Sequence, residues 1–419
     1  MKLKKGRILL LSALSILNIF IGGALDLYGQ GGKTWMGNNL EQQIKAARLN
    51  LGPFRIRTDF YLTDAGYDSN VYRTSTNPIR DFSITLGPGF YVYLPIEKKI
   101  VISIYESPRY VYFVETKRER TWNNYFSGQV HFVLNRIFIT LGKGYSVARQ
   151  IWSTEIDARP QRKDDSSQGS LLWQISKKTS LFFGFIRAKY EYEDLSLGEF
   201  KIKNALDRTE DRGDFTGYYR ISYRTMFFLN VQYSQYKFQN PLNPRDSKSY
   251  GIYSGFEFSP FGVFRGRIHL GYKYFNVLNP GIKNYRGIVG DTDISIRVVR
   301  PLTIRANYRR GVQLSTYDYA YYIESIIGSG GSVYLSKNIR LDYNYNFGRN
   351  SYPATTVGQS SPQTRKDIYE SQSAGIYFRV KKNIGLGVIA SLWQRVSSVY
   401  WANTKQTMIG INLIYDFRR

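Results

Sequence analysis

From residue 54 to the end of the chain, apolar and polar residues alternate with a period of two, as expected of a β-strand whose two faces meet different surroundings. In the segment VFRGRIHLGYKYF (263–275), bulky apolar or small residues occupy every second position. The residues between them are Arg265, Arg267, His269, Gly271 and Lys273. One face of this predicted strand is therefore apolar, and the opposite face is largely basic.

About eighteen alternating segments follow one another along the chain. They lie near residues 54–62, 81–94, 99–114, 121–134, 137–147, 168–176, 179–192, 213–224, 225–238, 248–259, 262–277, 285–299, 301–314, 319–335, 338–348, 368–380, 383–397 and 405–417. Strands of globular proteins average about 5–6 residues, whereas a tilted strand needs about 9–11 residues to cross a bilayer. Most of these segments have the greater length, which favours membrane-crossing strands.

The connections between the segments are of two kinds, and the two kinds alternate. Tight turns include PIEKK (95–99) and KKN (381–383), whereas long polar stretches rich in Asn, Asp, Ser, Pro and Gly include 64–80 and 148–167. Outer-membrane barrels have this asymmetry, with short periplasmic turns and longer outer loops. The sequence alone leaves open whether a loop such as 148–167 folds inward and seals the pore.

Two soluble β architectures compete with a membrane barrel. A sandwich also alternates apolar and polar residues, and a propeller blade repeats about every 40 residues, which is close to the spacing of the tight turns. A blade contains four short strands, however, whereas each repeat here contains two long strands and a long loop. Tyr and Phe also cluster near segment ends, as at 90–93, 110–113, 272–275 and 319–322, as interfacial girdles do. We predict an all-β fold, a transmembrane antiparallel up-and-down β-barrel of about 18 strands, within 16–20.

Residues 1–24 have the pattern of a secretory signal peptide. Four Lys or Arg residues within 2–7 precede an apolar run over residues 8–24, which ends in the small residues Gly22, Gly23 and Ala24. An uncleaved anchor helix is the alternative interpretation. Cleavage after Ala24 would remove the four cationic residues and lower the net charge from +26 to +22.

Residues 25–53 are predicted to form a periplasmic N-terminal leader ahead of the barrel, which is expected to occupy 54–419. Leu40, Ile44 and Ala47 recur at helical spacing, and a Gly-Pro pair ends the pattern. The segment is interpreted either as a frayed periplasmic extension or as a small plug helix.

The composition adds a basic excess and excludes several chemistries. The chain of 419 residues has 58 Lys and Arg against 32 Asp and Glu, and it has no Cys. Disulfides, thiolate nucleophiles and Cys-ligated metal sites are therefore excluded. The basic excess has two interpretations: a positive lumen that concentrates anions, or outer loops whose cationic side chains pair with lipopolysaccharide phosphates.

The columns of charge within strands favour a basic lumen. An Arg or Lys on the lipid face costs about 2–4 kcal/mol at the bilayer midplane, so these columns are expected to face a water-filled interior. The residues expected to carry lumen selectivity are Arg55, Arg57, Arg220, Arg224, Arg265, Arg267, Lys273, Arg297, Arg305, Arg309, Arg340 and Arg379. They predict a channel that attracts anions by electrostatic force, with no covalent step.

The stretch GYDSNVYRT (66–74), followed by NPIRDFSITLGPGFYVYLPI (77–96), resembles the start of a family of outer-membrane β-barrel porins associated with exopolysaccharide production and export. The motif residues, which in that family lie just after the first strand, are Tyr67, Asp68, Ser69, Asn70 and Val71. The detailed likeness covers about 30 residues and implies no catalysis. A basic lumen also resembles alginate-export barrels, whose substrate is an acidic polysaccharide, although a fold does not fix a function.

The last segment, KQTMIGINLIYDFRR (405–419), alternates as far as Phe417. Many outer-membrane barrels end in such a strand with a final aromatic residue, which the barrel-assembly machinery reads. This chain departs from that pattern because Arg418 and Arg419 follow Phe417.

Three further sequence features bear on cation binding, phosphate binding and catalysis. Asp64, Asp68 and Asn70 suggest a cation site, but an EF-hand needs a mid-loop Gly and a Glu at position twelve, so Asx-type loop hydrogen bonds are favoured. TLGKGYS (140–146) lacks the spacing of a phosphate-binding P-loop. His269 is the candidate catalytic residue of a barrel enzyme, but the sequence places no Ser or Asp beside it, and triads are recognised by geometry. No catalytic, cofactor or metal site is predicted.

The sequence thus predicts a bacterial outer-membrane channel, reached by Sec-type secretion, for passive passage or export of hydrophilic, preferentially anionic solutes. An acidic exopolysaccharide is the sharper expectation. Expected partners are outer-membrane lipid and lipopolysaccharide, the barrel-assembly machinery, and export-system proteins, whereas nucleic acid is not expected. The alternatives are a barrel enzyme that uses His269, and a non-conducting structural or adhesion barrel.

Overall fold

The computed structural model describes residues 33–47, 49–97, 99–197, 200–258, 263–316, 319–353, 364–399 and 402–416. The predicted signal peptide and the terminal residues Phe417, Arg418 and Arg419 lie outside the described residues. No helix among the described residues is long and apolar enough to cross a membrane.

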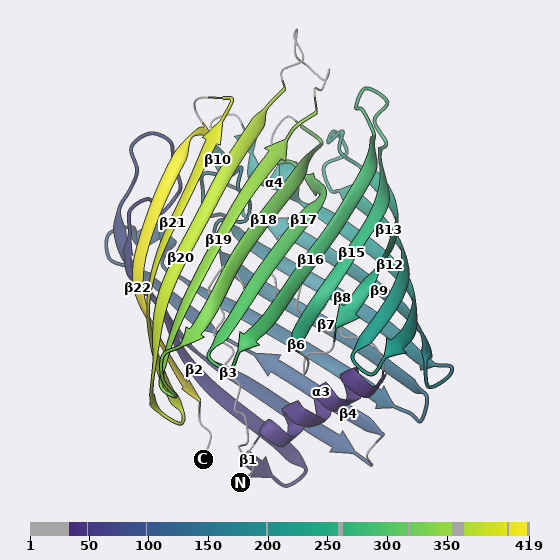
Figure 1. Ribbon diagram of the computed structural model, residues 1–419. Helices are drawn as coiled ribbons and strands as arrows, with labels where there is room; N and C mark the ends of the chain where they lie inside the picture. Colours follow the sequence, from purple (N-terminus) through teal and green to yellow (C-terminus); the bar gives the residue numbers. More distant parts are fainter. Residues whose placement is uncertain are drawn as a thin grey trace.

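The described residues form a closed antiparallel barrel of 18 strands (Figure 1). Its strands are β2 (Phe54–Asp68), β3 (Asp81–Ile96), β4 (Ile100–Glu106) with β5 (Arg109–Phe113), β6 (Thr121–Val133), β7 (Ile137–Arg149), β8 (Gln161–Gln174), β9 (Thr179–Tyr192), β12 (Arg208–Ser222), β13 (Thr225–Phe238), β14 (Ser247–Phe258), β15 (Phe264–Val277), β16 (Tyr285–Val299), β17 (Leu302–Leu314), β18 (Tyr321–Tyr334), β19 (Ile339–Ser351), β20 (Lys366–Lys381), β21 (Ile384–Ser397) and β22 (Thr404–Asp416). β4 and β5 are two parts of one interrupted strand, because both pair with β3 and β6. Pairing of β2 with β22 closes the ring.

Shorter elements lie at the ends of the barrel and in its long loops. They are α3 (Lys33–Ala46), β1 (Leu49–Leu51), η2 (Lys117–Glu119), β10 (Ser196–Leu197), β11 (Phe200–Lys201) and α4 (Ile202–Leu206). β1 extends the sheet beside the start of β2, whereas η2, β10, β11 and α4 belong to the long loops.

The predicted strand pattern is confirmed, and the largest differences in strand bounds have a common cause. β8 begins at Gln161 and β12 at Arg208, several residues before the predicted starts at 168 and 213. These first residues are polar on both faces of the strand. These residues therefore pair with the neighbouring strands although they lack the alternation of apolar and polar residues that a lipid-facing strand requires. The inward-reaching connection between β7 and β8 is correspondingly shorter than the predicted loop 148–167.

A bulge explains why β2 was predicted to end near residue 62. The register of β2 shifts between Leu62 and Ala65 against β22, and Asp64 has a φ of 55°. A bulge adds a residue to one strand and so exchanges the faces of all residues that follow. The strand therefore continues to Asp68, but its alternation is inverted after the bulge.

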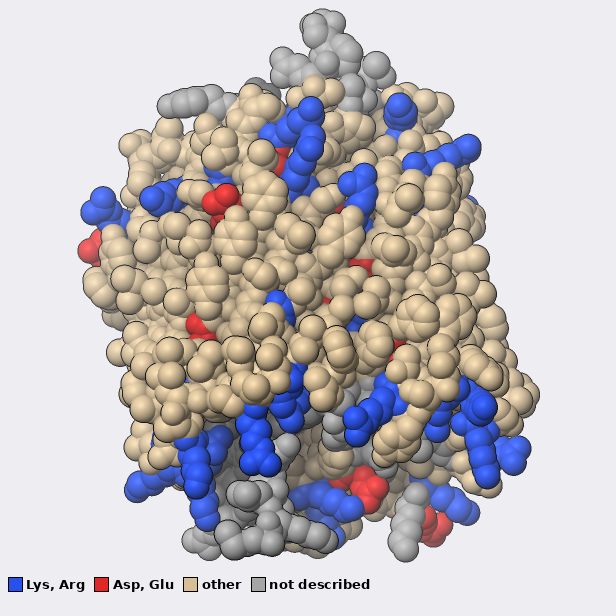
Figure 2. Space-filling view, viewed as in Figure 1, with Lys and Arg blue, Asp and Glu red and all other residues tan. Residues whose placement is uncertain are grey.

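The outer surface of the barrel carries a broad apolar band. Large outward side chains that remain exposed include Phe183, Phe185, Phe215, Leu229, Val231, Leu270, Tyr272 and Ile288. Charged residues are sparse across the middle of the face in Figure 2, whereas Lys and Arg gather toward its lower edge. A continuous apolar band of this kind matches a lipid-facing belt.

Helix α3 covers one side of the lumen at the end that carries the tight turns (Figure 1). Leu40 and Ala47 lie in a buried cluster with residues from the inner faces of seven strands, namely Tyr93, Val101, Phe138, Leu172, Phe182, Tyr218 and Phe228. Tyr93 also donates a hydrogen bond to Gln43 (3.4 Å). The helix thus packs on the wall formed by β3 to β13 and leaves the wall from β15 to β20 facing the remaining lumen.

Candidate functional site

Residues 150–160, between β7 and β8, fold into the barrel and are named here the crossing segment. Glu155 is fully buried and accepts hydrogen bonds from the Ser315 hydroxyl (2.8 Å), the Thr316 amide (2.8 Å) and the Thr316 hydroxyl (2.9 Å). Ser315 and Thr316 belong to the connection between β17 and β18. Because these elements lie about half a turn of the ring away from β7 and β8, this contact spans the lumen.

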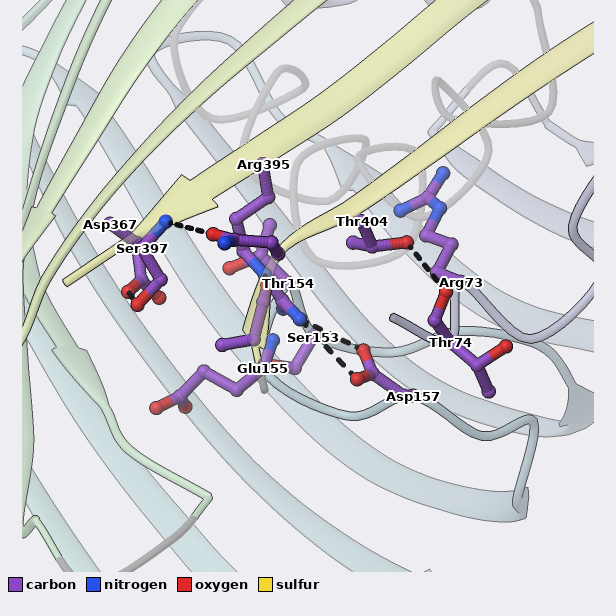
Figure 3. A network of polar contacts seen from close by, with 12 residues as sticks. Arg73, Thr74, Ser153, Thr154, Glu155, Asp157, Asp367, Arg395, Ser397 and Thr404 are labelled. Atoms are coloured by element: carbon purple, nitrogen blue, oxygen red, sulfur yellow. Dashed lines mark hydrogen bonds and ion pairs between the residues drawn. The ribbon is translucent and has the colours of Figure 1, made fainter. Parts of the chain in front are cut away.

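Two further contacts join the crossing segment to the far wall, and Figure 3 shows the one between Arg395 and Asp157. Asn350 of β19 donates a hydrogen bond to the Thr154 hydroxyl (3.2 Å). The guanidinium of Arg395, on β21, forms an ion pair with Asp157 (3.0 Å). The segment therefore narrows the lumen at the end that carries the long loops.

The crossing segment is also anchored on its own side of the barrel. Ile156 is 1% exposed and packs in a cluster with Tyr190 of β9 and with Ile202 and Leu206 of α4. Arg159 forms an ion pair with Glu119 of η2 (3.4 Å). With anchors on both walls, the segment is a folded part of the barrel interior.

The ionisable groups of the crossing segment sit in poorly hydrated surroundings. Burial raises the pKa of Glu155 and of Asp157, although hydrogen bonds to both carboxylates and nearby arginines act in the opposite direction. Burial lowers the pKa of Arg159, and it lowers the pKa of Arg73, in the β2–β3 loop, to about 10. Removing any one partner would leave a buried charge without compensation, which is costly.

Several lumen arginines form an ion pair with the acidic residue two positions later in the chain. In most pairs both residues lie on one strand, and in one pair the arginine directly precedes the strand. Residues two apart on a strand face the same side, so the two side chains of such a pair can meet. The pairs are Arg57–Asp59, Arg162–Asp164, Arg208–Glu210, Arg212–Asp214, Arg340–Asp342 and Arg365–Asp367. The recurring Arg-x-Asp/Glu spacing was visible in the sequence, but the pairing of each arginine with the acid two residues later was not predicted. These pairs cancel much of the positive charge that the arginines alone would give the lumen.

Several of the residues predicted to carry selectivity contact an acidic side chain, an aromatic ring or a backbone carbonyl. Arg57 and Arg340 lie in the pairs above, and Arg309 of β17 forms an ion pair with Asp291 of β16 (3.1 Å). Arg267 stacks over the Phe228 ring (4.0 Å), and Arg55 donates to the Gly52 carbonyl (2.9 Å). Arg224 lies in the turn between β12 and β13, outside a strand, and Arg220 lies near the last inward positions of β12.

The remaining predicted residues, apart from Lys273, gather near the tight-turn end of the wall from β15 to β20. Ser295 of β16 is in register with Arg265 of β15 on one side and with Arg305 of β17 on the other. Arg297 lies two residues after Ser295 on β16, so the three arginines occupy neighbouring positions on three adjacent strands. Within the described part of the chain, Arg297, Arg305 and Arg379 form no ion pair. Arg297, Arg305 and Arg379 therefore bring positive charge to this end of the lumen that no ion pair with a described residue neutralises.

The tight turns at the same end add exposed cationic residues, named here the basic rim. The rim consists of Lys99, Arg136, Lys177, Lys178, Arg224, Arg300, Lys337, Lys381 and Lys382. Figure 2 shows Lys and Arg side chains along the lower edge of one face of the barrel. In outer-membrane barrels the short turns face the periplasm, so in such a barrel this positive end of the lumen would be the periplasmic mouth.

The motif Tyr67–Asp68–Ser69–Asn70–Val71 joins the first and last strands of the barrel. Asp68 accepts hydrogen bonds from the Gln406 amide (2.8 Å) and from the backbone of Asn70 (2.8 Å). Ser69 exchanges hydrogen bonds with the backbone of Thr407, and Val71 is fully buried. The motif therefore has a structural role at the closing seam.

Asn70 is the central residue of this seam, at 2% exposure. Its side-chain amide donates to the carbonyls of Thr74 (2.9 Å) and Lys405 (3.1 Å), and its oxygen accepts from the Thr74 amide (3.0 Å). We expect Asn70→Ala to destabilise the folded barrel by about 1–3 kcal/mol, because buried groups lose their partners. Heat-modifiable migration on SDS gels should be lost at a lower temperature. Asn135→Ala, in an exposed tight turn, is the matched control, and an equal shift in both variants would contradict this role.

Neither described histidine forms a catalytic triad. His269 has Phe228 and Tyr253 edge-on around its ring (6.1 and 5.7 Å between centroids). Its register partner Asp291 instead accepts a hydrogen bond from Arg309. His131 lies between the hydroxyls of Ser103 and Thr140 (3.0 Å each), beside the apolar wall under α3. The geometry supplies no Ser–His–Asp arrangement among the described residues.

A family model described as "Putative beta-barrel porin 2" matches residues 174–417, which is more than half of the chain. The chain belongs to this porin family. No curated protein matches the porin in sequence. The similarity to known porins therefore rests on the match to the family model and on the fold.

Solved porin structures share the barrel architecture at low sequence identity. A BenF-like porin from Pseudomonas fluorescens Pf-5 matches with a TM-score of 0.51 and 10% identity, over 87% of this porin and 99% of that chain. OpdK and OpdO from Pseudomonas aeruginosa each match with a TM-score of 0.50 and 10% identity, over 86% of this porin and 98% and 97% of those chains. These similarities support an outer-membrane porin-like barrel and establish the fold alone.

Proposed function

We propose that this porin conducts hydrophilic solutes passively, that it prefers anions, and that it takes them up at its periplasmic mouth. The observation that carries the proposal is the group Arg297, Arg305 and Arg379, which form no ion pair with a described residue and lie next to the basic rim. A mouth lined by one sign of charge raises the local concentration of oppositely charged solutes. The paired arginines farther along the lumen add hydrogen-bonding capacity with little net charge.

An acidic exopolysaccharide is the solute class that we propose for export. Positive charge at the periplasmic mouth would collect carboxylates on the side from which an exported chain must enter. The Arg–Asp and Arg–Glu pairs then offer donors and acceptors for successive hydroxyl and carboxylate groups. The crossing segment stands in this path, so passage of a polymer requires it to move aside.

The proposal is tested by single-channel recording of the refolded mature protein in planar bilayers under a KCl gradient. We expect open channels whose reversal potential favours chloride. A reversal potential that favours potassium, or one that shows no preference, would contradict the anion preference. A folded, heat-modifiable barrel that never conducts would instead support the non-conducting structural alternative.

A further inference from the structure

A polar cavity of about 310 Å³ opens on the inner wall between β7 and β17. Ligand pockets range from about 300 to 1,000 Å³, so the cavity accommodates one small molecule. Its wall combines amides and hydroxyls with aromatic rings. The uncharged polar residues that line it include Gln168, Gln232, Gln313, Ser146, Ser166 and Ser234, and Tyr190 and Tyr236 supply rings. Such a lining suits a ligand with several hydroxyl groups.

The acidic residues that line the cavity already have cationic partners. Asp164 pairs with Arg162 (2.6 Å) and Glu210 with Arg208 (2.7 Å). The third acid, Asp211, pairs with Arg187 (2.6 Å). No lining carboxylate is therefore left to bind a cationic ligand.

The two cationic residues of the cavity differ from each other. Arg212 forms a bidentate contact with Asp214 (2.8 and 3.2 Å). Lys273 is only 9% exposed, lines the cavity, and forms no ion pair or side-chain hydrogen bond with any residue in the described part of the chain. The Lys273 side chain thus brings a positive charge to the cavity wall without a fixed partner among the described residues, and an anionic ligand would compensate this charge.

We propose that this cavity is a binding subsite for a hydroxylated monocarboxylate of sugar-acid type, with Lys273 binding the carboxylate. One unpaired cation matches one negative charge, and the amides and hydroxyls match the hydroxyl groups of the ligand. The inference rests on the proposed function and deepens it, because it names the unit of an acidic polysaccharide that the lumen recognises. Tyr190 belongs both to the cavity wall and to the apolar anchor of the crossing segment, so the bound unit lies beside the constriction.

Isothermal titration calorimetry on the detergent-solubilised full barrel tests the subsite, with D-glucuronate as the probe and D-glucose as its uncharged counterpart. We expect glucuronate to bind at least about tenfold more tightly than glucose, since a hydrogen bond to a charged group is stronger than one between neutral groups. Lys273→Met should weaken glucuronate binding about tenfold or more, whereas Lys273→Arg should retain most of it. Lys237→Met, an exposed outward position on β13, is the matched control and should bind as the wild type does.

The outcomes separate this inference from the proposed function. Glucuronate that binds equally to the wild type and to a heat-modifiable Lys273→Met barrel would overturn the subsite, and so would the absence of binding to a folded wild type. Anion-selective conduction without glucuronate binding would overturn the subsite while the channel function stands. Glucuronate binding to a barrel that does not conduct would support the subsite and contradict the channel.

Discussion

Replacing residues 150–160 by a two-residue Asn-Gly turn is expected to raise the single-channel conductance severalfold. Arg149 and Gln161 are register partners on β7 and β8, so a tight turn can join the two strands directly. The change removes the segment that spans the lumen through Glu155 and Asp157. A barrel of this strand number otherwise encloses a wide aqueous channel, and conductance rises with the open cross-section.

Point substitutions distinguish release of the crossing segment from damage to the barrel. Glu155→Gln combined with Asp157→Asn retains the chain length but weakens the contacts between the crossing segment and the far wall. This double variant should therefore open to a large conductance more often than the wild type, but its pore should not stay wide permanently. Glu97→Gln, in an exposed tight turn, is the control that should leave the recordings unchanged. Wild-type conductance in a folded deletion variant would show that the segment does not limit the pore.

Charge reversal at the periplasmic mouth is expected to invert ion selectivity. Arg297→Glu with Arg305→Glu replaces two cations that form no ion pair with a described residue by two anions. The reversal potential under a KCl gradient should move from a chloride-favouring to a potassium-favouring value, because the sign of the field at the mouth changes. High salt should reduce the difference between the variant and the wild type, since screening shortens the range of the field.

The matched control for this experiment is Lys237→Glu, which makes the same kind of change on the outer surface. It should leave the reversal potential at its wild-type value. An equal shift in the control and in the double variant would mean that total charge, rather than charge at the mouth, sets the preference. An unchanged potential in the double variant would remove Arg297 and Arg305 from the selectivity mechanism.

The strands were predictable because lipid imposes a rule on every second residue, and that rule is visible in the sequence. Where the rule does not apply, prediction failed: the polar starts of β8 and β12 lack an apolar face, and the bulge at Asp64 inverts the alternation. The closing-seam motif was noticed through a resemblance, but its partners on β22 are more than 300 residues away in the chain. No local pattern indicates such a contact.

The same limit applies to the candidate site. The basic columns were predicted, but the ion pairs between an arginine and the acid two residues later were not. The crossing segment looked like one polar loop among several, since the partners of Glu155 and Asp157 are residues that lie 160 and 238 positions later in the chain. Loop placement depends on the closed ring, which the sequence pattern does not describe.

The anchors of the crossing segment have a consequence for the order of assembly. Ser315, Asn350 and Arg395 belong to elements formed by the last third of the chain. The segment between the fifth and sixth strands therefore has no far wall to dock on until those later strands have joined the sheet. A partly assembled barrel is unobstructed, and the constriction forms only when the ring is nearly complete. The constriction is thus a property of the finished ring, and assembly intermediates lack it.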